Sequence, residues 1–356
     1  MKSEYSKNIK LLLFVSILCV ACIEIFIRSF IPVSYNYWEF SKDFHHTFIK
    51  NLSVVRNYGN YSIDFVTDTH GFRSKEFSYQ KPKKTKRILV LGDSITTSVS
   101  VSSDKIFTHL LSDYLNNNSP SSWEVINRGV ESSSTDIEYL YFIKEGYKYE
   151  PDIILLQFSQ NDIFDVEVYN ITQVHNNTLI IRDWFELPSL AQKIEIYING
   201  HIALYRFFAE FYNSHLKDRT SEHSFYISDG YNNEFYDAME KVTQLIEKIH
   251  KYAKKQGSLF LVVIYPDPRA VNKNYYDFWN RMQKSYLPQQ ELKKPIMLVR
   301  NFLERNNISY LDTSPGINQT NDYISLEDGH LSAAGNKKMA DLLYKNIIDI
   351  IKKPSS

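Results

Sequence analysis

The segment Arg87-Ile-Leu-Val-Leu-Gly-Asp-Ser-Ile-Thr96 sets the architecture expected for this chain. Its aliphatic and β-branched residues, Ile88 to Leu91, predict a short buried strand. The glycine that follows allows a sharp turn, so Asp93 and Ser94 are expected at the carboxyl end of this strand, just before a helix. Open α/β sheets bind their ligands at that edge. Because Gly-Asp-Ser is also a common turn sequence, the interpretation depends on what lies downstream.

Apolar runs alternate with helical patterns from Arg87 onward. Helices of ordinary length between strands imply right-handed crossovers and a parallel sheet covered on both faces, and the fully apolar runs at 153–156 and 259–264 suit its central strands. We therefore predict a three-layer α/β/α, flavodoxin-like domain over residues 87–351 with about five parallel strands. The predicted strands are 88–91, 124–127, 153–158, 259–265 and 308–311, and the predicted helices are about 104–115, 135–147, 233–255, 292–305 and 332–351.

Two other segments do not follow this alternation. Residues 34–86 are rich in Tyr, Asn, Ser and Asp and lack a helical period, which predicts an irregular extension packed on the main domain, with one strand-like stretch at 62–66. The adjacent His45 and His46 should point to opposite sides of an extended chain, so a surface pair is expected rather than a metal site. Residues 163–229 form an insertion after the third strand, with a strand-like patch at 178–183 and a helix at 201–211, that serves either as a lid or wall beside the carboxyl edge or as a packing appendage.

Residues 1–33 carry the targeting signal. Lysines precede the apolar run Leu11 to Ile23, and apolar residues then continue, interrupted by Glu24 and Arg28. As a signal-anchor, Leu11 to about Ile31 would span the bilayer, with Arg28 snorkelling to the far interface and the lysines in the cytoplasm. As a signal peptide it would be cleaved nearby, and Val20-Ala21-Cys22 resembles the end of a lipoprotein box. We favour the anchor, and either alternative places the bulk of the chain outside the cytoplasm, in a bacterial periplasm or at the cell surface.

The composition is that of a globular protein with a large core. Of 356 residues, 43% are hydrophobic, with 26 Tyr and 22 Phe. Lys plus Arg balances Asp plus Glu at 41 each, so no nucleic-acid partner is expected. Cys19 and Cys22 are the only cysteines, and both lie in the N-terminal apolar segment. Disulfides and thiolate metal sites are therefore excluded from the rest of the chain.

Three polar groups lie at predicted strand ends or helix starts. They are Ser94, the block Ser159-Gln160-Asn161-Asp162, and Glu327-Asp328-Gly329-His330 before the last helix. Each alone is an ordinary turn. Together they supply a nucleophile in Ser94, a general base in His330, an orienting carboxylate in Asp328 and an amide donor for an oxyanion in Asn161.

In this order the blocks resemble those of the SGNH/GDSL hydrolase superfamily, and the resemblance extends from about Arg87 to Ile351. The matching blocks are Gly92-Asp93-Ser94-Ile95, Asn127-Arg128-Gly129-Val130, Ser159-Gln160-Asn161-Asp162 and Asp328-Gly329-His330. The resemblance implies the SGNH hydrolase fold and ester hydrolysis or acyl transfer without a metal or organic cofactor. It also implies an oxyanion hole made by the Ser94 backbone N–H, a second-block N–H and the Asn161 side chain. The Gly-x-Ser-x-Gly elbow of α/β-hydrolases is absent.

The chain departs from the family pattern at three places. Glu131 and Ser132 stand where a glycine usually follows the second block; the Ser132 N–H can still donate, although serine prefers different backbone angles. Ser159 replaces a usual glycine in the third block. The orienting acid is two residues before the histidine in some members and three in others, so Glu327 is an alternative to Asp328. We favour Asp328 because its shorter side chain is held more rigidly.

These observations predict a membrane-tethered serine esterase that acts on acyl or acetyl esters outside the cytoplasm, with an acylated glycan or lipid as a candidate substrate. An O-acyltransferase that modifies an envelope polysaccharide is the alternative. A catalytically inactive binding module is a third reading, which the intact Ser94, Asn161 and His330 disfavour. The sequence leaves the acyl chain, the alcohol and the oligomeric state open.

Overall fold

A computed structural model describes residues 2–31, 37–57, 61–169, 171–175, 178–182, 185, 188–215, 231–283 and 287–352. Its main sheet is parallel, with the strand order β11-β10-β7-β5-β6. The strands are β5 (Thr85–Gly92), β6 (Ser122–Gly129), β7 (Ile153–Phe158), β10 (Leu259–Ile264) and β11 (Tyr310–Asp312). The predicted α/β fold with about five parallel strands is confirmed, and each strand overlaps its predicted range.

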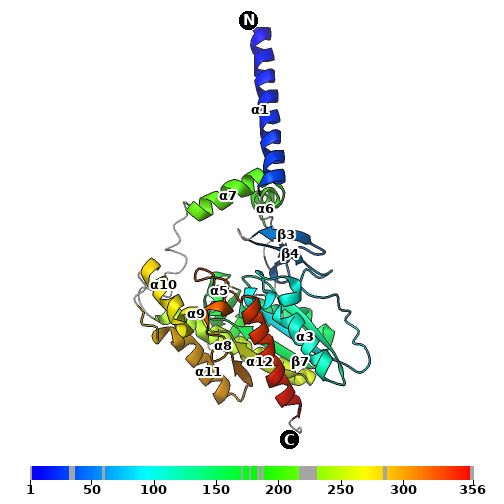
Figure 1. Cartoon of the computed structure of the whole chain (residues 1–356), viewed down its shortest axis with the longest axis vertical. Coiled ribbons are helices and arrows are strands. Elements are labelled where there is room, and N and C mark those ends of the chain that lie inside the picture. The colour runs from blue at the N-terminus through cyan, green and yellow to red at the C-terminus, as the bar shows by residue number, and fades with distance from the viewer. Residues whose placement is uncertain are drawn as a thin grey trace.

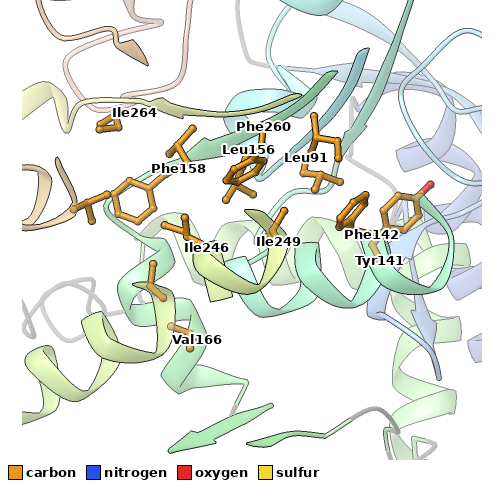
Figure 2. Packing of buried hydrophobic residues seen from close by; sticks show 14 of the residues in the cluster. Leu91, Tyr141, Phe142, Leu156, Phe158, Val166, Ile246, Ile249, Phe260 and Ile264 are labelled. Atoms are coloured by element: carbon orange, nitrogen blue, oxygen red, sulfur yellow. The ribbon is translucent and has the colours of Figure 1, made fainter. Parts of the chain in front are cut away.

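Side chains that alternate along each strand enter two separate cores. Leu89 and Leu91 of β5 face one layer, and Ile88 and Val90 face the other. The first layer is packed by α4 (Thr135–Lys144), α8 (Asn233–Gln256) and α11 (Lys294–Arg305), and the second by α3 (Phe107–Asn118) and α12 (Ala333–Lys352). Figure 2 shows aromatic and aliphatic side chains of α4 and α8 against the strands. A strand buried on both faces is expected to be mainly apolar, and in β7 Gln157 is the one polar residue.

The register of β5 brings three strand ends together. Gly92 pairs with Gly129 of β6, and Leu91 pairs with Leu156 of β7. The short helix α2 (Ser94–Thr97) then turns back across the strand ends. A Cβ atom on Gly92 would lie 2.2 Å from Thr96 Oγ1, and one on Gly129 would lie 2.5 Å from the Thr97 nitrogen. Only glycine allows this close approach, so these two positions fix where α2 begins.

The extension contains more structure than its sequence predicts. Two antiparallel hairpins pair β1 (Trp38–Ser41) with β2 (His45–Phe48) and β3 (Ser53–Asn57) with β4 (Ser62–Val66). The strand-like stretch at 62–66 is confirmed. The other three strands were not predicted, because runs of four or five residues rich in Tyr, Asn and Ser give too short a pattern. A buried ion pair between Asp68 and Arg128, 2.7 Å apart, holds this region against β6.

The N-terminal helix α1 (Lys2–Phe30) projects away from the rest of the chain (Figure 1). Its stretch Tyr5–Phe30 is long and apolar enough to cross a membrane. The insertion forms α5 (Asp162–Val168), β8 (Thr172–His175), β9 (Thr178–Ile181), α6 (Leu190–His201) and α7 (Ala203–His215). Helices α6 and α7 lie at the base of α1 (Figure 1), so these two helices do not form the lid considered above. Position 183 and residues 216–229 lie outside the described residues.

Candidate active site

The structure brings together Ser94, His330 and Asp328 at the carboxyl edge of the sheet. Ser94 Oγ lies 2.8 Å from His330 Nε2, and His330 Nδ1 lies 2.6 Å from Asp328 Oδ1. The Asp328 carboxylate also accepts the His330 backbone N–H at 2.9 Å. Glu327 is exposed, and its backbone N–H donates to Ser325 Oγ. The carboxylate that contacts the histidine is therefore the one two residues before it.

Two tyrosines fix the loop that carries His330. Tyr265, which follows β10, donates its hydroxyl to the Gly329 carbonyl at 2.5 Å. Tyr275, in α10 (Lys273–Gln283), donates to the Asp328 carbonyl at 3.0 Å. The backbone N–H of Ile324 donates to the His330 carbonyl at 3.0 Å. The imidazole is thus positioned by backbone restraints on both sides as well as by its carboxylate partner.

The turn before Ser94 is held by side chains of the first two blocks. Asp93 caps α2 by accepting the Ile95 N–H at 2.8 Å, as Asp commonly does at a helix start. Asn127 donates to the Thr96 carbonyl at 2.9 Å and accepts the Gly129 N–H at 2.9 Å. Both Asp93 and Asn127 are buried. They rigidly place the Ser94 hydroxyl at the start of the helix.

Ser132 has a left-handed backbone conformation, with φ of 61°. Glycine adopts this region without strain, whereas other residues are disfavoured there by about 1 kcal/mol or more. The Val130 N–H donates to the Gly92 carbonyl at 3.1 Å, which ties the loop to the end of β5. The position where the family usually has glycine therefore keeps a backbone conformation that favours glycine.

Asn161 lies beside two carboxylates. Its Nδ2 is 3.1 Å from Asp93 Oδ2 and 2.9 Å from Asp165 Oδ2. The amide group is thereby oriented by the residue next to Ser94 and by the first turns of α5. Both of its hydrogens face carboxylates here. Asn161 can therefore donate to an oxyanion only if one of these two hydrogen bonds breaks.

Opposing effects set the protonation of the histidine and its partner. Burial lowers the pKa of His330, but the hydrogen bond and negative charge of Asp328 outweigh burial, so its pKa is raised above the ordinary value. Burial raises the pKa of Asp328, and the hydrogen bond and positive charge of His330 outweigh this and lower it. His330 is therefore arranged as a base whose protonated form is stabilised by the Asp328 carboxylate.

Five carboxyl groups lie behind the strand ends, and burial raises the pKa of each: Asp93, Asp136, Glu138, Asp162 and Asp165. The pKa of Asp136 is raised to about 6 and that of Asp165 to about 7. Neither Glu138 carboxylate oxygen has a hydrogen-bond partner within the described part of the chain. The sequence did not point to this group, because its members are spread over three segments.

A second set of residues missed from the sequence surrounds Glu131. His46 is buried, contrary to the predicted surface pair, and its Nε2 lies 3.1 Å from the Glu131 carbonyl oxygen. Tyr37 donates its hydroxyl to the Glu131 carboxylate, and Arg56 Nη1 lies 3.8 Å from the same carboxylate. His45 has φ of 66°, which turns the two imidazoles together, with Nδ1 to Nδ1 at 2.8 Å. The rule for extended chains fails here because this residue is not extended.

Among the described residues, no group of three or more His, Cys, Asp or Glu side chains is arranged to hold a metal ion. The site offers a serine hydroxyl, an imidazole, carboxyl groups and a side-chain amide. These groups match the requirements of acyl transfer through a serine nucleophile.

Comparison with known families supports the same chemistry. The family model described as GDSL-like lipase/acylhydrolase matches residues 88–343. This range covers more than half of the chain and includes Ser94, Asn161 and His330. No curated protein sequence matches the chain.

Solved structures of GDSL-type proteins share low identity with this chain. A lipolytic protein of the G-D-S-L family from Desulfitobacterium hafniense is 12% identical, with a TM-score of 0.41, over 73% of this chain and 98% of that one. A GDSL-like lipase from Bacteroides thetaiotaomicron is 13% identical, with a TM-score of 0.41, over 76% and 92%. An acetylxylan esterase from Geobacillus stearothermophilus is 12% identical, with a TM-score of 0.42, over 74% and 94%.

The buried carboxyl groups predict an unusual pH dependence of stability. The pKa of Asp136 is raised to about 6 in the folded chain, so its contribution is present below about pH 4 and is lost as the pH rises through about 6. A shift of about two units corresponds to at most about 3 kcal/mol. We expect Asp136→Asn to reduce the loss in the free energy of unfolding between about pH 4 and about pH 8, as measured by denaturant unfolding.

The exposed Asp237 in α8 provides a matched control. Asp237→Asn should leave the pH dependence of the wild-type protein unchanged. If Asp136→Asn also leaves it unchanged, the pKa of Asp136 is not raised in the folded chain.

Proposed function

Since the chain belongs to the GDSL-like lipase/acylhydrolase family and is an ester hydrolase, we propose that it hydrolyses acyl or acetyl esters through Ser94, His330 and Asp328. The observation that carries this proposal is the pair of contacts on one imidazole. Nε2 reaches the Ser94 hydroxyl at 2.8 Å, and Nδ1 reaches the Asp328 carboxylate at 2.6 Å. Ser94 and His330 are 236 positions apart, so local turn formation does not account for their meeting.

In the proposed reaction, Ser94 Oγ attacks the ester carbonyl while His330 Nε2 takes its proton. Asp328 holds the Nδ1 hydrogen and stabilises the imidazolium that forms. The C–O bond to the alcohol then breaks, and His330 returns the proton to the departing alkoxide. Water attacks the acyl-enzyme with His330 again as base, which releases the carboxylic acid and restores the Ser94 hydroxyl. If a glycan hydroxyl replaces water in the second step, the same intermediate gives acyl transfer.

The negative oxygen of the tetrahedral intermediate needs donors that are in place before it forms. We assign the backbone N–H groups of Ser94 and Ser132 and the Nδ2 of Asn161 to this role. Support comes from the register of β5, β6 and β7, whose ends carry these three residues. Asn161 is oriented toward the turn before Ser94 by its bond to Asp93.

We also propose that α1 anchors the enzyme with its main domain outside the cytoplasm. The helix is exposed along its apolar stretch, and lysines at positions 2, 7 and 10 precede or begin that stretch. Lysines flanking a single span favour the cytoplasmic side. Glu24 contacts the start of α7 and Arg28 contacts the end of α6, so the end of α1 packs on the rest of the fold.

The nucleophile and one oxyanion donor can be separated by two substitutions. We expect Ser94→Ala to abolish labelling by a fluorophosphonate probe and hydrolysis of p-nitrophenyl acetate. Asn161→Ala should lower kcat by about 10²–10³ while labelling persists at a reduced rate, because it removes one donor and leaves the nucleophile. Labelling of Ser94→Ala as strong as that of the wild type would refute Ser94 as nucleophile.

The carboxylate partner of His330 predicts a shift in the pH profile. The base must be neutral, so kcat/KM falls as the pH drops through the His330 pKa, which Asp328 raises. Asp328→Asn should move this limb to lower pH and reduce kcat by up to about 10⁴. Glu327→Gln is the matched control and should change neither quantity, since the Glu327 side chain is exposed. A large loss in Glu327→Gln alone would reassign the orienting acid.

A further inference from the structure

Helices α6 and α7 present large apolar side chains to the outside. The residues recur at spacings of three and four, so they form one stripe on each helix. Their exposure ranges from 38 to 75%, and they are Leu190, Ile194 and Tyr197 on α6 and Tyr205, Phe208 and Tyr212 on α7. Soluble surfaces seldom gather so many apolar and aromatic side chains in one place.

The end of α1 holds this helix pair in place. The Glu24 carboxylate accepts the backbone N–H groups of Ala203 at 2.9 Å and Leu204 at 2.8 Å, and thereby caps the start of α7. Arg28 donates to the carbonyl of His201 at the end of α6. Ile27 and Ala203 are buried together. Glu24, Ile27 and Arg28 all lie after Cys22.

The contact between the end of α1 and helices α6 and α7 is expected at the level of the bilayer surface. About 20 helical residues cross the hydrocarbon core, so a span that begins at Leu11, after the lysines, ends near Phe30. Glu24 and Arg28 then lie in the last two turns of the span. Helix α7 runs across the axis of α1 rather than along it (Figure 1). A helix in this orientation, with Tyr and Phe on its free face, fits the interface between headgroups and acyl chains.

We propose that α6 and α7 lie in the outer interface of the bilayer, with their apolar stripe against lipid. This inference rests on the anchoring role proposed for α1. The hairpin of β3 and β4 lies between these helices and the sheet (Figure 1), and Arg56 of β3 pairs with Glu131 at the carboxyl edge. The catalytic edge therefore faces the membrane, which suits an ester held at the bilayer surface.

Spin labels on the full-length protein test this arrangement. Cys19→Ser and Cys22→Ser give a cysteine-free chain for reconstitution into vesicles of phosphatidylethanolamine and phosphatidylglycerol. Single cysteines are then placed as Ile194→Cys, Phe208→Cys, Val15→Cys within the span, and Met297→Cys on α11, where the side chain is 51% exposed. Power saturation with oxygen and with a water-soluble nickel chelate reports the depth of each label.

The labels at 194 and 208 should be more accessible to oxygen than to nickel, as at position 15, whereas position 297 should show the reverse. If 194 and 208 behave like 297, the helices are in water and the proposal fails while the anchor stands. Low accessibility to both reagents would mean that protein covers the stripe, which also overturns it. If position 15 itself is in water, the anchor and this inference both fail, without bearing on the esterase chemistry.

A separate observation concerns the loop that carries Ser132. The Glu131 carbonyl and the Ser132 N–H belong to one peptide group, and His46 Nε2 lies 3.1 Å from that carbonyl. A carbonyl only accepts, so Nε2 carries the proton. The Nδ1 of His46 then accepts from His45 Nδ1 at 2.8 Å. Burial lowers the pKa of His46 to about 4, which agrees with a neutral ring.

The Glu131 side chain is also held by residues that precede the main domain in the chain, as His46 does. Tyr37 donates to its carboxylate, Arg56 lies 3.8 Å from it, and the Arg56 guanidinium stacks 4.2 Å from the Tyr37 ring centre. We infer that His46, together with Tyr37 and Arg56, positions the Glu131–Ser132 peptide so that its N–H points at the oxyanion. The three residues are positioning residues, and the inference rests on the proposed esterase function.

The His46→Ala variant tests this role. Misaligning an oxyanion donor should lower kcat by about tenfold or more with KM nearly unchanged, because the donor acts in the transition state. His46→Gln should restore part of the rate through its amide hydrogen. The matched control is His109→Ala, which removes a half-buried imidazole bonded to a backbone carbonyl, that of Ser103, in a different part of the fold.

If kcat falls no more in His46→Ala than in His109→Ala, the positioning role is overturned. Activity of the wild-type protein would still uphold the esterase proposal. An equal rise in KM would also overturn it, since that indicates general damage to substrate binding. Absence of p-nitrophenyl acetate hydrolysis by the wild-type protein would remove both the esterase and the positioning role. Thermal unfolding of each variant confirms that the folded chain is being compared.

Discussion

The parallel pairing of β5 with β6 and β7 is the constraint on which the site depends. In this register the strand ends that carry Ser94, Ser132 and Asn161 lie at one edge of the sheet. The two glycines at the ends of β5 and β6 leave no room for a side chain beside α2. A substitution at either glycine therefore has to displace the helix that begins with Ser94, even though neither residue touches a substrate.

The fold and the polar groups of the strand ends were predictable because their signals are local. Ile153 to Phe158 is apolar except at Gln157, and Asp328-Gly329-His330 directly precedes a periodic helix. The residues that hold these groups in place were not predictable, because they come from distant segments of the chain. Tyr265 and Tyr275 restrain the histidine loop from the region after β10, and no sequence pattern marks a tyrosine as a hydrogen-bond donor to a carbonyl 50 or more positions away. His46 was misassigned because its neighbour has a left-handed backbone conformation.

The buried carboxyl groups affect how well the proposed site can hold a negative charge. The proposed intermediate is negative, and Asp93 and Asp165 both contact Asn161, one of its proposed donors. At a separation of about 5 Å and an effective dielectric of about 20, two negative charges repel by about 3 kcal/mol. Burial raises the pKa of both acids, which favours their neutral forms. Their burial therefore weakens the repulsion that full ionisation would exert on an oxyanion.

The unit that performs the chemistry is larger than the segment that defines the family. The family match begins at residue 88, after both hairpins. Yet Asp68 forms the buried pair with Arg128, and Tyr37, His46 and Arg56 contact Glu131 beside the strand ends. A fragment starting at residue 88 would keep Ser94, Asn161 and His330 but would lack both the carboxylate that pairs with Arg128 and the Phe72 ring that covers its guanidinium. Because the hairpins come between α1 and β5 in the chain, they connect α1 to the region beside the loop that holds Ser132.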